Sequence, residues 1–133
     1  MKYLLDTNVC VDYLSGRYPG VVRRVHGSPP ADLALSSVVV AELRYGADRS
    51  GRPRANHARV DVLVAEVPPL EFDHDAAGAY GRLRAGLETA GAPIGPNDML
   101  IAAQALSRGL VLVTDNVGEF RRVKGLKIEN WRQ

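Results

Sequence analysis

Short apolar runs alternate with longer amphipathic stretches along this 133-residue chain. Short runs bounded by turn residues are typical of buried strands, whereas apolar residues recurring every three or four positions indicate helices. Strands are expected at residues 3–5, 33–35, 67–72, 110–114 and 126–128. Helices are expected at residues 8–14, 18–26, 38–47, 53–65, 76–90, 97–108 and 116–122. This alternation predicts an α/β fold, with a parallel sheet covered by helices on both faces.

Prolines, glycines and serines mark the ends of several of these elements. Pro68 and Pro69 fall in the third predicted strand, and because proline lacks an N–H donor they place that strand at a sheet edge. Gly109 follows the helix at 97–108 and is expected to close it. Ser36 or Ser37 is expected to cap the helix that begins near residue 38.

Two aspartates interrupt the apolar pattern where strands end. Asp6 follows the strand at 3–5 directly, and Asp115 follows the strand at 110–114. In a parallel sheet the carboxyl ends of all strands lie along one edge, and ligands bind there at the point where the strand order reverses. We therefore expect both carboxylates at this edge.

Asp98 is placed at the same edge by the length of its helix. The helix at 97–108 ends at Gly109, immediately before a parallel strand begins. It must therefore finish at the amino edge of the sheet. About eleven residues of helix rise about 16 Å, which matches a five-residue strand. Asp98, in the first turn, is thus expected at the carboxyl edge.

Glu42 is the only charged residue in the window from Val38 to Leu43. An unpaired buried carboxylate costs several kcal/mol, usually avoided by protonation, pairing or metal binding. A capping box does not explain it, because Ser37 would need its acid three residues later, where Val40 stands. Glu42 is therefore the fourth candidate.

Each acid also has a simpler explanation when it is taken alone. Asp6 could cap a helix, Asp98 could complement a helix dipole, and Asp115 could be a turn residue. Glu42 could be exposed or paired with an arginine. Four carboxylates that converge on one edge, however, repel one another unless cations lie between them. An all-oxygen set without His or Cys favours Mg²⁺ or Mn²⁺.

Glu119 is interpreted differently from these four acids. Asn116 and Glu119 have the spacing of a capping box, so Glu119 is expected to fold back on its own helix. Four polar neighbours are expected to cap helices, or to orient carboxylates and bound water: Thr7, Asn8, Asn97 and Thr114.

Composition excludes disordered, secreted and membrane-spanning classes of protein. The length suits one domain over residues 1–133, and a hydrophobic share of 46% excludes a disordered chain. No apolar stretch is long enough for a signal peptide or a membrane span. Cys10, the single cysteine, cannot form an internal disulfide, which fits a reducing cytoplasm. We expect a cytoplasmic protein without a membrane partner.

Basic residues lie close to the acidic positions in the sequence. The formal net charge is +2, and it becomes +6 when the four candidate acids are set aside. Five arginines lie between residues 44 and 59, and Arg121, Arg122 and Lys124 follow Asp115. Basic residues beside a metal site would bind the phosphates of a nucleic-acid backbone. Alternatively, they form a solvent-exposed basic surface without a partner.

Four motifs follow one another along the chain: LLDTNV, SSVVVAELRYGA, PIGPNDMLIAAQAL and LVTDNVGEF. In this order they resemble the PIN-domain ribonucleases, and more closely the VapC-type toxins of toxin–antitoxin pairs. The resemblance covers nearly the whole chain. It implies that Asp6, Glu42, Asp98 and Asp115 bind Mg²⁺ or Mn²⁺ and support RNA hydrolysis. It also implies a three-layer α/β/α sandwich with about five parallel strands, a homodimer, and an antitoxin that blocks the site.

The resulting hypothesis is an endoribonuclease that uses metal-activated water and leaves 5′-phosphate and 3′-hydroxyl ends. One alternative is a PIN fold that binds RNA or a partner without catalysis. Another is a receiver-like signalling domain, which would need an acidic pair early in the chain that Asp6 lacks. A dehalogenase-like phosphatase would need Asp-x-Asp, and Asn8 stands at the third position.

Overall fold

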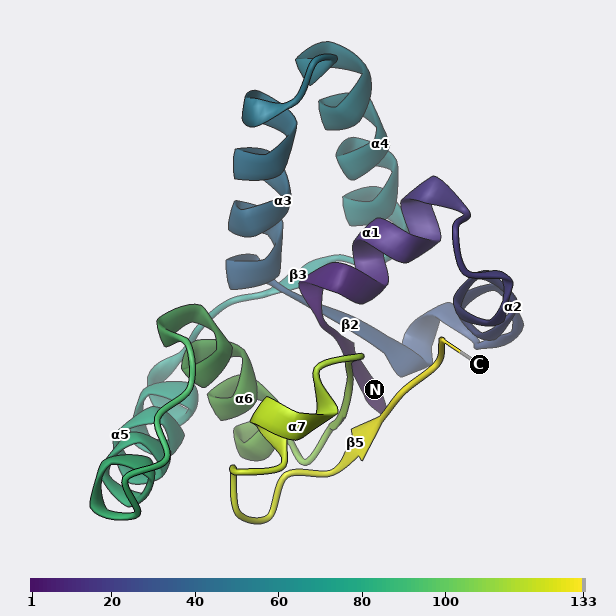
Figure 1. The fold of residues 1–133 in the computed structure, drawn as a ribbon. Helices are drawn as coiled ribbons and strands as arrows, with labels where there is room; N and C mark the ends of the chain where they lie inside the picture. The colour runs from purple at the N-terminus through teal and green to yellow at the C-terminus, as the bar shows by residue number, and fades with distance from the viewer. Residues whose placement is uncertain (133) are drawn as a thin grey trace.

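The computed structural model describes residues 1–132, which form a five-stranded parallel sheet between layers of helices (Figure 1). The strands are β1 (Tyr3–Leu5), β2 (Leu33–Ser36), β3 (Pro69–Leu70), β4 (Val111–Val113) and β5 (Ile128–Glu129). Their order across the sheet is β3-β2-β1-β4-β5. The α/β architecture with about five parallel strands is therefore confirmed.

Helices fill the connections between these strands. They are α1 (Thr7–Ser15), α2 (Pro19–Gly27), the 3₁₀ helix η1 (Pro30–Asp32), α3 (Ser37–Arg49), α4 (Pro53–Glu66), α5 (His74–Thr89), α6 (Pro96–Arg108) and α7 (Val117–Phe120). Figure 1 shows α1 to α4 on one side of the sheet and α5 to α7 on the other, as right-handed crossovers require. Within residues 1–132, no helix has the combined length and apolarity of a membrane span.

The strand order reverses between the two central strands, β1 and β4. From β1 the chain continues through β2 to β3 on one side, and it returns through α5 and α6 to β4 on the other. Leu5 of β1 is in register with Leu35 of β2 and with Val113 of β4. The residues that follow β1 and β4 therefore emerge side by side at the carboxyl edge.

The centre of the sheet is buried on both faces, as expected for strands covered by two layers. Leu4, Leu5, Leu35, Leu112 and Val113 are each at most 1% exposed. Each fully buried side chain of this kind contributes roughly 1.5–3 kcal/mol of transfer free energy. The rigid, dry strands thus hold the polar residues at their ends in fixed positions.

Local signals set the element ends much as the sequence predicts. The Ser36 hydroxyl accepts a hydrogen bond from the Val38 N–H at 3.0 Å and caps α3. Gly109 has a φ of 64° and closes α6 in the left-handed region that favours glycine. The third strand is shorter than the expected 67–72 and lies at the sheet edge, because proline leaves the ladder with few donors.

Candidate metal centre at the carboxyl edge of the sheet

Asp6 lies at the first turn after β1 and has two roles. Its Oδ1 accepts from the Thr7 N–H at 2.8 Å, which caps α1, and its Oδ2 accepts from the Thr114 hydroxyl at 2.8 Å. The side chain is buried, and burial raises its pKa. Hydrogen bonds from Thr114 and Thr7 oppose this shift, while the charges of Glu42 and Asp115 add to it. Asp6 therefore both caps α1 and belongs to the carboxylate cluster.

Asp115 follows β4 and is held from two sides. The Asn8 side-chain amide donates to its Oδ1 at 3.2 Å, and Arg132 Nη1 lies 3.0 Å from its Oδ2. Of the two roles expected for Asn8, the structure shows the second: Asp6 caps α1, and Asn8 orients Asp115. Asp115 thus joins Asp6 at the carboxyl edge, as predicted.

Glu42 projects from the second turn of α3 toward the same edge. Its Oε1 accepts from the Thr7 hydroxyl at 2.6 Å, which links α3 to the start of α1. Glu42 also shares a cavity of about 280 Å³ with Asp98 and the Gly95–Asn97 segment. A half-buried carboxylate with a single hydroxyl donor keeps acceptor capacity free for a further ligand.

Asp98 lies in the first turn of α6, half-buried, and faces Glu119. Burial raises the pKa of Asp98 to about 7, helped by a hydrogen bond to Glu119 and by the charges of Glu119, Asp6 and Glu42. Burial also acts on Glu119, but the Gly95 N–H, Asp98 and Asn116 donate to it and Arg122 attracts it, so its pKa is lowered. Asp98 therefore holds a proton in mildly acidic solution and loses it as the pH rises through about 7.

Glu119 belongs to this group, and it forms only part of the predicted capping box: it contacts the Asn116 side chain but not the Asn116 backbone N–H. The Asn116 N–H donates to Thr114 Oγ1, so it is not available to Glu119. The Glu119 carboxylate instead accepts from the Gly95 N–H at 2.7 Å and from the Asn116 side chain. Capping-box spacing exists in the sequence, but the loop before α6 offers a competing donor.

Gly95 is the residue that allows this approach, and the sequence did not single it out. A Cβ at Gly95 would lie 3.2 Å from Asp98 Oδ2 and 3.7 Å from Glu119 Oε1. Its N–H also donates to Glu119, so backbone and side chains meet here without intervening atoms. The loop glycine before a helix carrying Asp98 was the available signal for a close approach.

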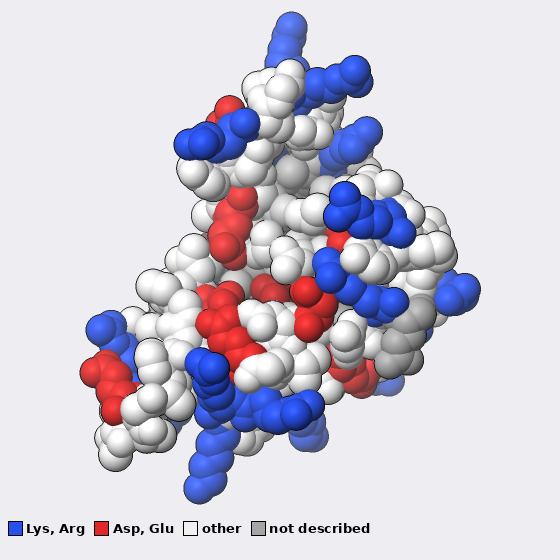
Figure 2. Space-filling model, in the orientation of Figure 1, with Lys and Arg blue, Asp and Glu red and all other residues white. Residues whose placement is uncertain are grey.

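The five carboxylates form one acidic patch. Figure 2 shows acidic side chains gathered in the hollow between the α3–α4 hairpin and the α6–α7 side, with basic side chains around them. The charge of Asp6 is felt by Asp98, and the charges of Glu42 and Asp115 are felt by Asp6. The structure therefore brings together all four predicted acids and adds Glu119.

The donor set fits a hard divalent cation. The oxygens come from carboxylates and hydroxyls, without histidine or thiolate, and such a set suits Mg²⁺ or Mn²⁺ rather than Zn²⁺. Across residues 1–132, however, no three Asp, Glu, His or Cys side chains already stand in a geometry that would hold one ion. The oxygens point to Thr7, Thr114 and to each other instead. Coordination would need side-chain rotation and release of the proton held by Asp98.

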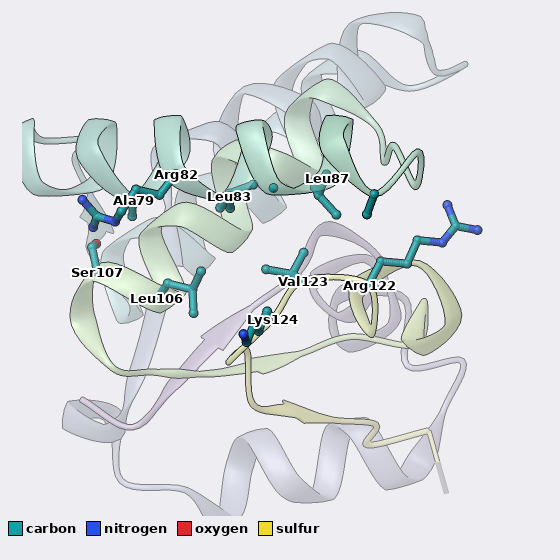
Figure 3. A pocket seen from close by; sticks show the side chains of 11 residues that line it. Ala79, Arg82, Leu83, Leu87, Leu106, Ser107, Arg122, Val123 and Lys124 are labelled. Carbon is teal, nitrogen blue, oxygen red and sulfur yellow. The ribbon is translucent and has the colours of Figure 1, made fainter.

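A second hollow has a different character. Figure 3 shows Leu83, Leu87, Leu106 and Val123 facing one another between α5, α6 and the loop after α7. This groove encloses about 570 Å³, and no carboxylate is among its lining residues. Its charged lining residues are all cationic, so it offers no carboxylates to hold a divalent cation, and the acidic edge is the candidate active site.

Comparisons with known proteins agree with this assignment. A family model described as PIN domain matches residues 3–126. The tRNA(fMet)-specific endonuclease VapC of Shigella flexneri is 40% identical over 131 residues, which cover 98% of each chain. The ribonuclease VapC2 of Rickettsia felis is 37% identical over 133 residues, again 98% of each chain.

Solved structures agree as well. A chain of the DNA-bound VapBC structure from Salmonella typhimurium matches with a TM-score of 0.93, at 38% identity over 98% of both chains. A chain of VapBC-1 from nontypeable Haemophilus influenzae matches with a TM-score of 0.90, at 34% identity over 100% of both. The three-layer fold is thus confirmed, and the receiver-like and dehalogenase-like alternatives are set aside. The chain belongs to the PIN-domain family and, within it, to the VapC ribonucleases.

Proposed function

We propose that this chain is a Mg²⁺- or Mn²⁺-dependent endoribonuclease, the toxin of a toxin–antitoxin pair, acting in the cytoplasm as one nuclease domain over residues 1–133. The observation that carries the proposal is the convergence of Asp6, Glu42, Asp98 and Asp115 at one edge of a VapC fold. Glu119 extends this set. A binding protein without catalysis would have no need for so many mutually repelling acids.

The roles of the carboxylates follow from their surroundings. Bound Mg²⁺ or Mn²⁺ would polarise the phosphodiester and activate a water for attack. Asp6 and Asp98 are the principal ligands in this proposal, and Glu42, Asp115 and Glu119 complete the set. In this proposal either Glu42 or Asp98 would accept the proton of the attacking water. The ribose 2′-hydroxyl has no part in this route.

Basic residues around the edge support an RNA substrate. Arg121, Arg122 and Lys124 are exposed just after α7, and Figure 2 shows basic side chains beside the acidic patch. Arg44 is less available, because it pairs with Asp61 at 2.6 Å. Exposed cations next to a metal centre hold the phosphates on either side of the cleaved bond.

The decisive experiment identifies the RNA ends that the protein makes. Purified wild type, Asp6→Asn and the matched control Glu88→Gln are incubated with bulk RNA and with tRNA(fMet), since one relative is named for it. Glu88 is exposed on α5 and pairs with Arg84 away from the acidic edge. We expect 5′-phosphate and 3′-hydroxyl ends from wild type and control only. Cyclic 2′,3′-phosphate ends, or equal cleavage by Asp6→Asn, would contradict the proposal.

An apolar groove beside Glu42 supports the antitoxin part of the proposal. It encloses about 440 Å³ between α1, α3 and α4, and its lining includes Val11, Leu14, Leu43 and Val60. Val11 is 47% exposed, which is unusual for a residue facing such a groove. A peptide segment of the antitoxin lying here would reach the acidic edge and exclude RNA.

Co-expression tests this placement. Growth arrest on expression of the toxin should be relieved by the neighbouring small gene, and Val11→Glu should remove that relief without reducing cleavage by the free toxin. Val62→Glu is the control, because Val62 is 57% exposed on α4 and lines a different hollow. Relief that survives Val11→Glu, or harmless expression of wild type with intact RNA, would contradict the assignment.

The outer face of α3 supports the proposed homodimer. Tyr45 is 64% exposed and lines a hollow of about 680 Å³, whose apolar part is formed with Val38, Ala41 and Leu100 and whose polar part includes Thr7 and Glu42 of the acidic edge. An exposed aromatic residue among apolar neighbours is typical of a protein interface. Sedimentation velocity should show a wild-type dimer that Tyr45→Arg converts to a monomer. A monomeric wild type, or a dimer that Tyr45→Arg leaves intact, would contradict this.

A further inference from the structure

The segment after β5 is fastened to the sheet by an aromatic and ionic cluster. Trp131 is buried, and its ring meets the edge of Tyr3 with centroids 5.0 Å apart. The indole N–H donates to Glu129 at 2.9 Å, and Arg24 lies 4.6 Å from the ring centroid and 3.3 Å from Glu129. These contacts fix the backbone that carries Arg132 toward the acidic edge.

All three guanidinium nitrogens of Arg132 contact carboxylates, and these belong to two residues. Its Nε and Nη2 donate to the two oxygens of Asp12 at 2.7 and 3.1 Å, and its Nη1 lies 3.0 Å from Asp115 Oδ2. The guanidinium carbon lies 4.2 Å from the centroid of the Tyr18 ring. The planar group is therefore held at its edges by acids and on one face by an aromatic ring.

Asp12 explains why this arrangement is stable. Its side chain is only 3% exposed, on the buried side of α1, so it requires a partner of opposite charge. Because α1 also carries Asp6 as its cap, Arg132 connects that helix to the loop after β4. With Asn8 on Oδ1 and Arg132 on Oδ2, the Asp115 carboxylate is held at both oxygens.

We propose that Arg132 is a positioning residue of the nuclease site: anchored by Asp12, it fixes the Asp115 carboxylate and offsets one negative charge beside the other acids. The proposal rests on the proposed nuclease function. Arg132 contacts two carboxylates of the protein through all three guanidinium nitrogens, so its charge is already offset within the fold and is less available to RNA. Arg132 therefore acts through Asp115 and not on the substrate.

Two variants distinguish a role of Arg132 in positioning Asp115 from a role in folding. Arg132→Lys keeps a cation for Asp12 but cannot span both carboxylates. The double variant Asp12→Asn, Arg132→Gln removes both charges, so neither is left buried without its partner. Arg24→Gln is the matched control, because Arg24 fastens the same segment through Glu129 and Trp131 without contacting the acidic edge. All are assayed well below the melting temperature measured for each.

In both Arg132 variants we expect kcat for RNA cleavage to fall about five- to tenfold, with KM unchanged. The dependence of kcat/KM on salt should also be unchanged. In the RNA-free double variant, calorimetry should show Mn²⁺ binding about fivefold tighter, because the cation beside Asp115 has been removed, and Arg132→Lys should show a smaller gain, because its ammonium group stays with Asp12. Arg24→Gln should lower the melting temperature and leave kcat and Mn²⁺ affinity at wild-type values.

Other outcomes overturn the proposal in distinguishable ways. A raised KM, with a salt slope shallower by about one and kcat unchanged, would make Arg132 an RNA contact. A lowered melting temperature, with kcat and Mn²⁺ affinity unchanged, would make its role structural only. If wild type cleaves no RNA, the proposed function fails, and Mn²⁺ affinity that does not change in the variants would then overturn the role of Arg132 by itself.

Discussion

The two halves of the acidic edge differ in how their oxygens are held. Asp6 and Asp115 each have both carboxylate oxygens bound by donors that carry no negative charge: Thr7, Thr114, Asn8 and Arg132. Asp98 and Glu119 instead bind one another, and burial together with this contact raises the pKa of Asp98 to about 7. The first half is held entirely by donors of the fold, whereas in the second half the contact between the two carboxyl groups depends on a proton at Asp98.

This difference indicates where the site changes when a cation binds. The first half keeps its position, because its donors lie in α1, at the end of β4 and in the segment after β5. In the other half, a cation would have to displace the proton held by Asp98, since metal ligands must be deprotonated. The Asp98–Glu119 pair is therefore the responsive part, and Asp6 with Asp115 is the frame.

Replacing the responsive aspartate should have the largest effect. Asp98→Asn keeps the size of the side chain and removes the exchangeable proton and the charge. We expect Mg²⁺-dependent cleavage to fall by more than about a hundredfold, since changes to groups around metal ligands already cost 10- to 100-fold. Circular dichroism should show a native fold, and Glu88→Gln is the control. Full activity in a clean preparation would remove Asp98 from the site.

Glu119→Gln tests whether the pair includes Glu119 at all. The amide can still accept from the Gly95 N–H but cannot share a proton with Asp98 as a carboxylate does. Cleavage should fall about 10- to 100-fold, with the melting temperature little changed. The kcat of each variant, measured at saturating Mg²⁺, checks this. Activity within twofold of wild type would restore the capping-box interpretation, in which Glu119 serves only its own helix.

The positions of Asp6, Asp115 and Asp98 could be predicted from the sequence, because topology alone determines them. Asp6 and Asp115 directly follow strands, and Asp98 opens a helix whose end is fixed by Gly109, so alternation and length place all three. Glu42 was found as a lone charge in an apolar window. None of these placements required a particular side-chain contact to be predicted.

Glu119 and Arg132 could not be predicted, because competing partners decide their positions. Local spacing offered Glu119 the Asn116 backbone, but Thr114 occupies that donor and the Gly95 N–H is available instead. Arg132 reaches its carboxylates only because β5 is short and the following residues cross toward α1. Such choices depend on tertiary geometry, which a pattern of apolar and polar positions does not encode.

Asp115→Asn tests the frame and should have a smaller effect than either change to the pair. An asparagine oxygen can still accept a hydrogen bond from Arg132. The NH₂ group of the asparagine would, however, face a donor of Asn8 or Arg132, and two donors do not form a hydrogen bond. We expect cleavage to fall about tenfold, the low end of the range for groups at a metal site, because Asp115 completes the ligand set and is not a principal ligand in this proposal. Single-turnover rates at saturating Mg²⁺ would measure it. A loss as large as that of Asp98→Asn would make the two halves equivalent.

The smallest effect concerns the stability of the protein without divalent cations. The folded state raises the pKa of Asp98 from 3.8 to about 7, so between these values it binds a proton that the unfolded chain has lost. Stability from this group is therefore greatest at low pH and is lost as pH rises from about 4 to 7. The lowered pKa of Glu119 acts oppositely, but only below its ordinary value of 4.5.

In EDTA, the melting temperature of wild type should therefore fall by a few degrees relative to Asp98→Asn as pH rises from 5 to 8. Solvent screening keeps the effect small, because Asp98 is only half-buried. Excess Mn²⁺ should reverse the trend, since a bound cation replaces the proton and stabilises the ionised pair. Parallel melting curves for the two proteins across this range would show that Asp98 carries no such proton, and the distinction between frame and responsive pair would be lost.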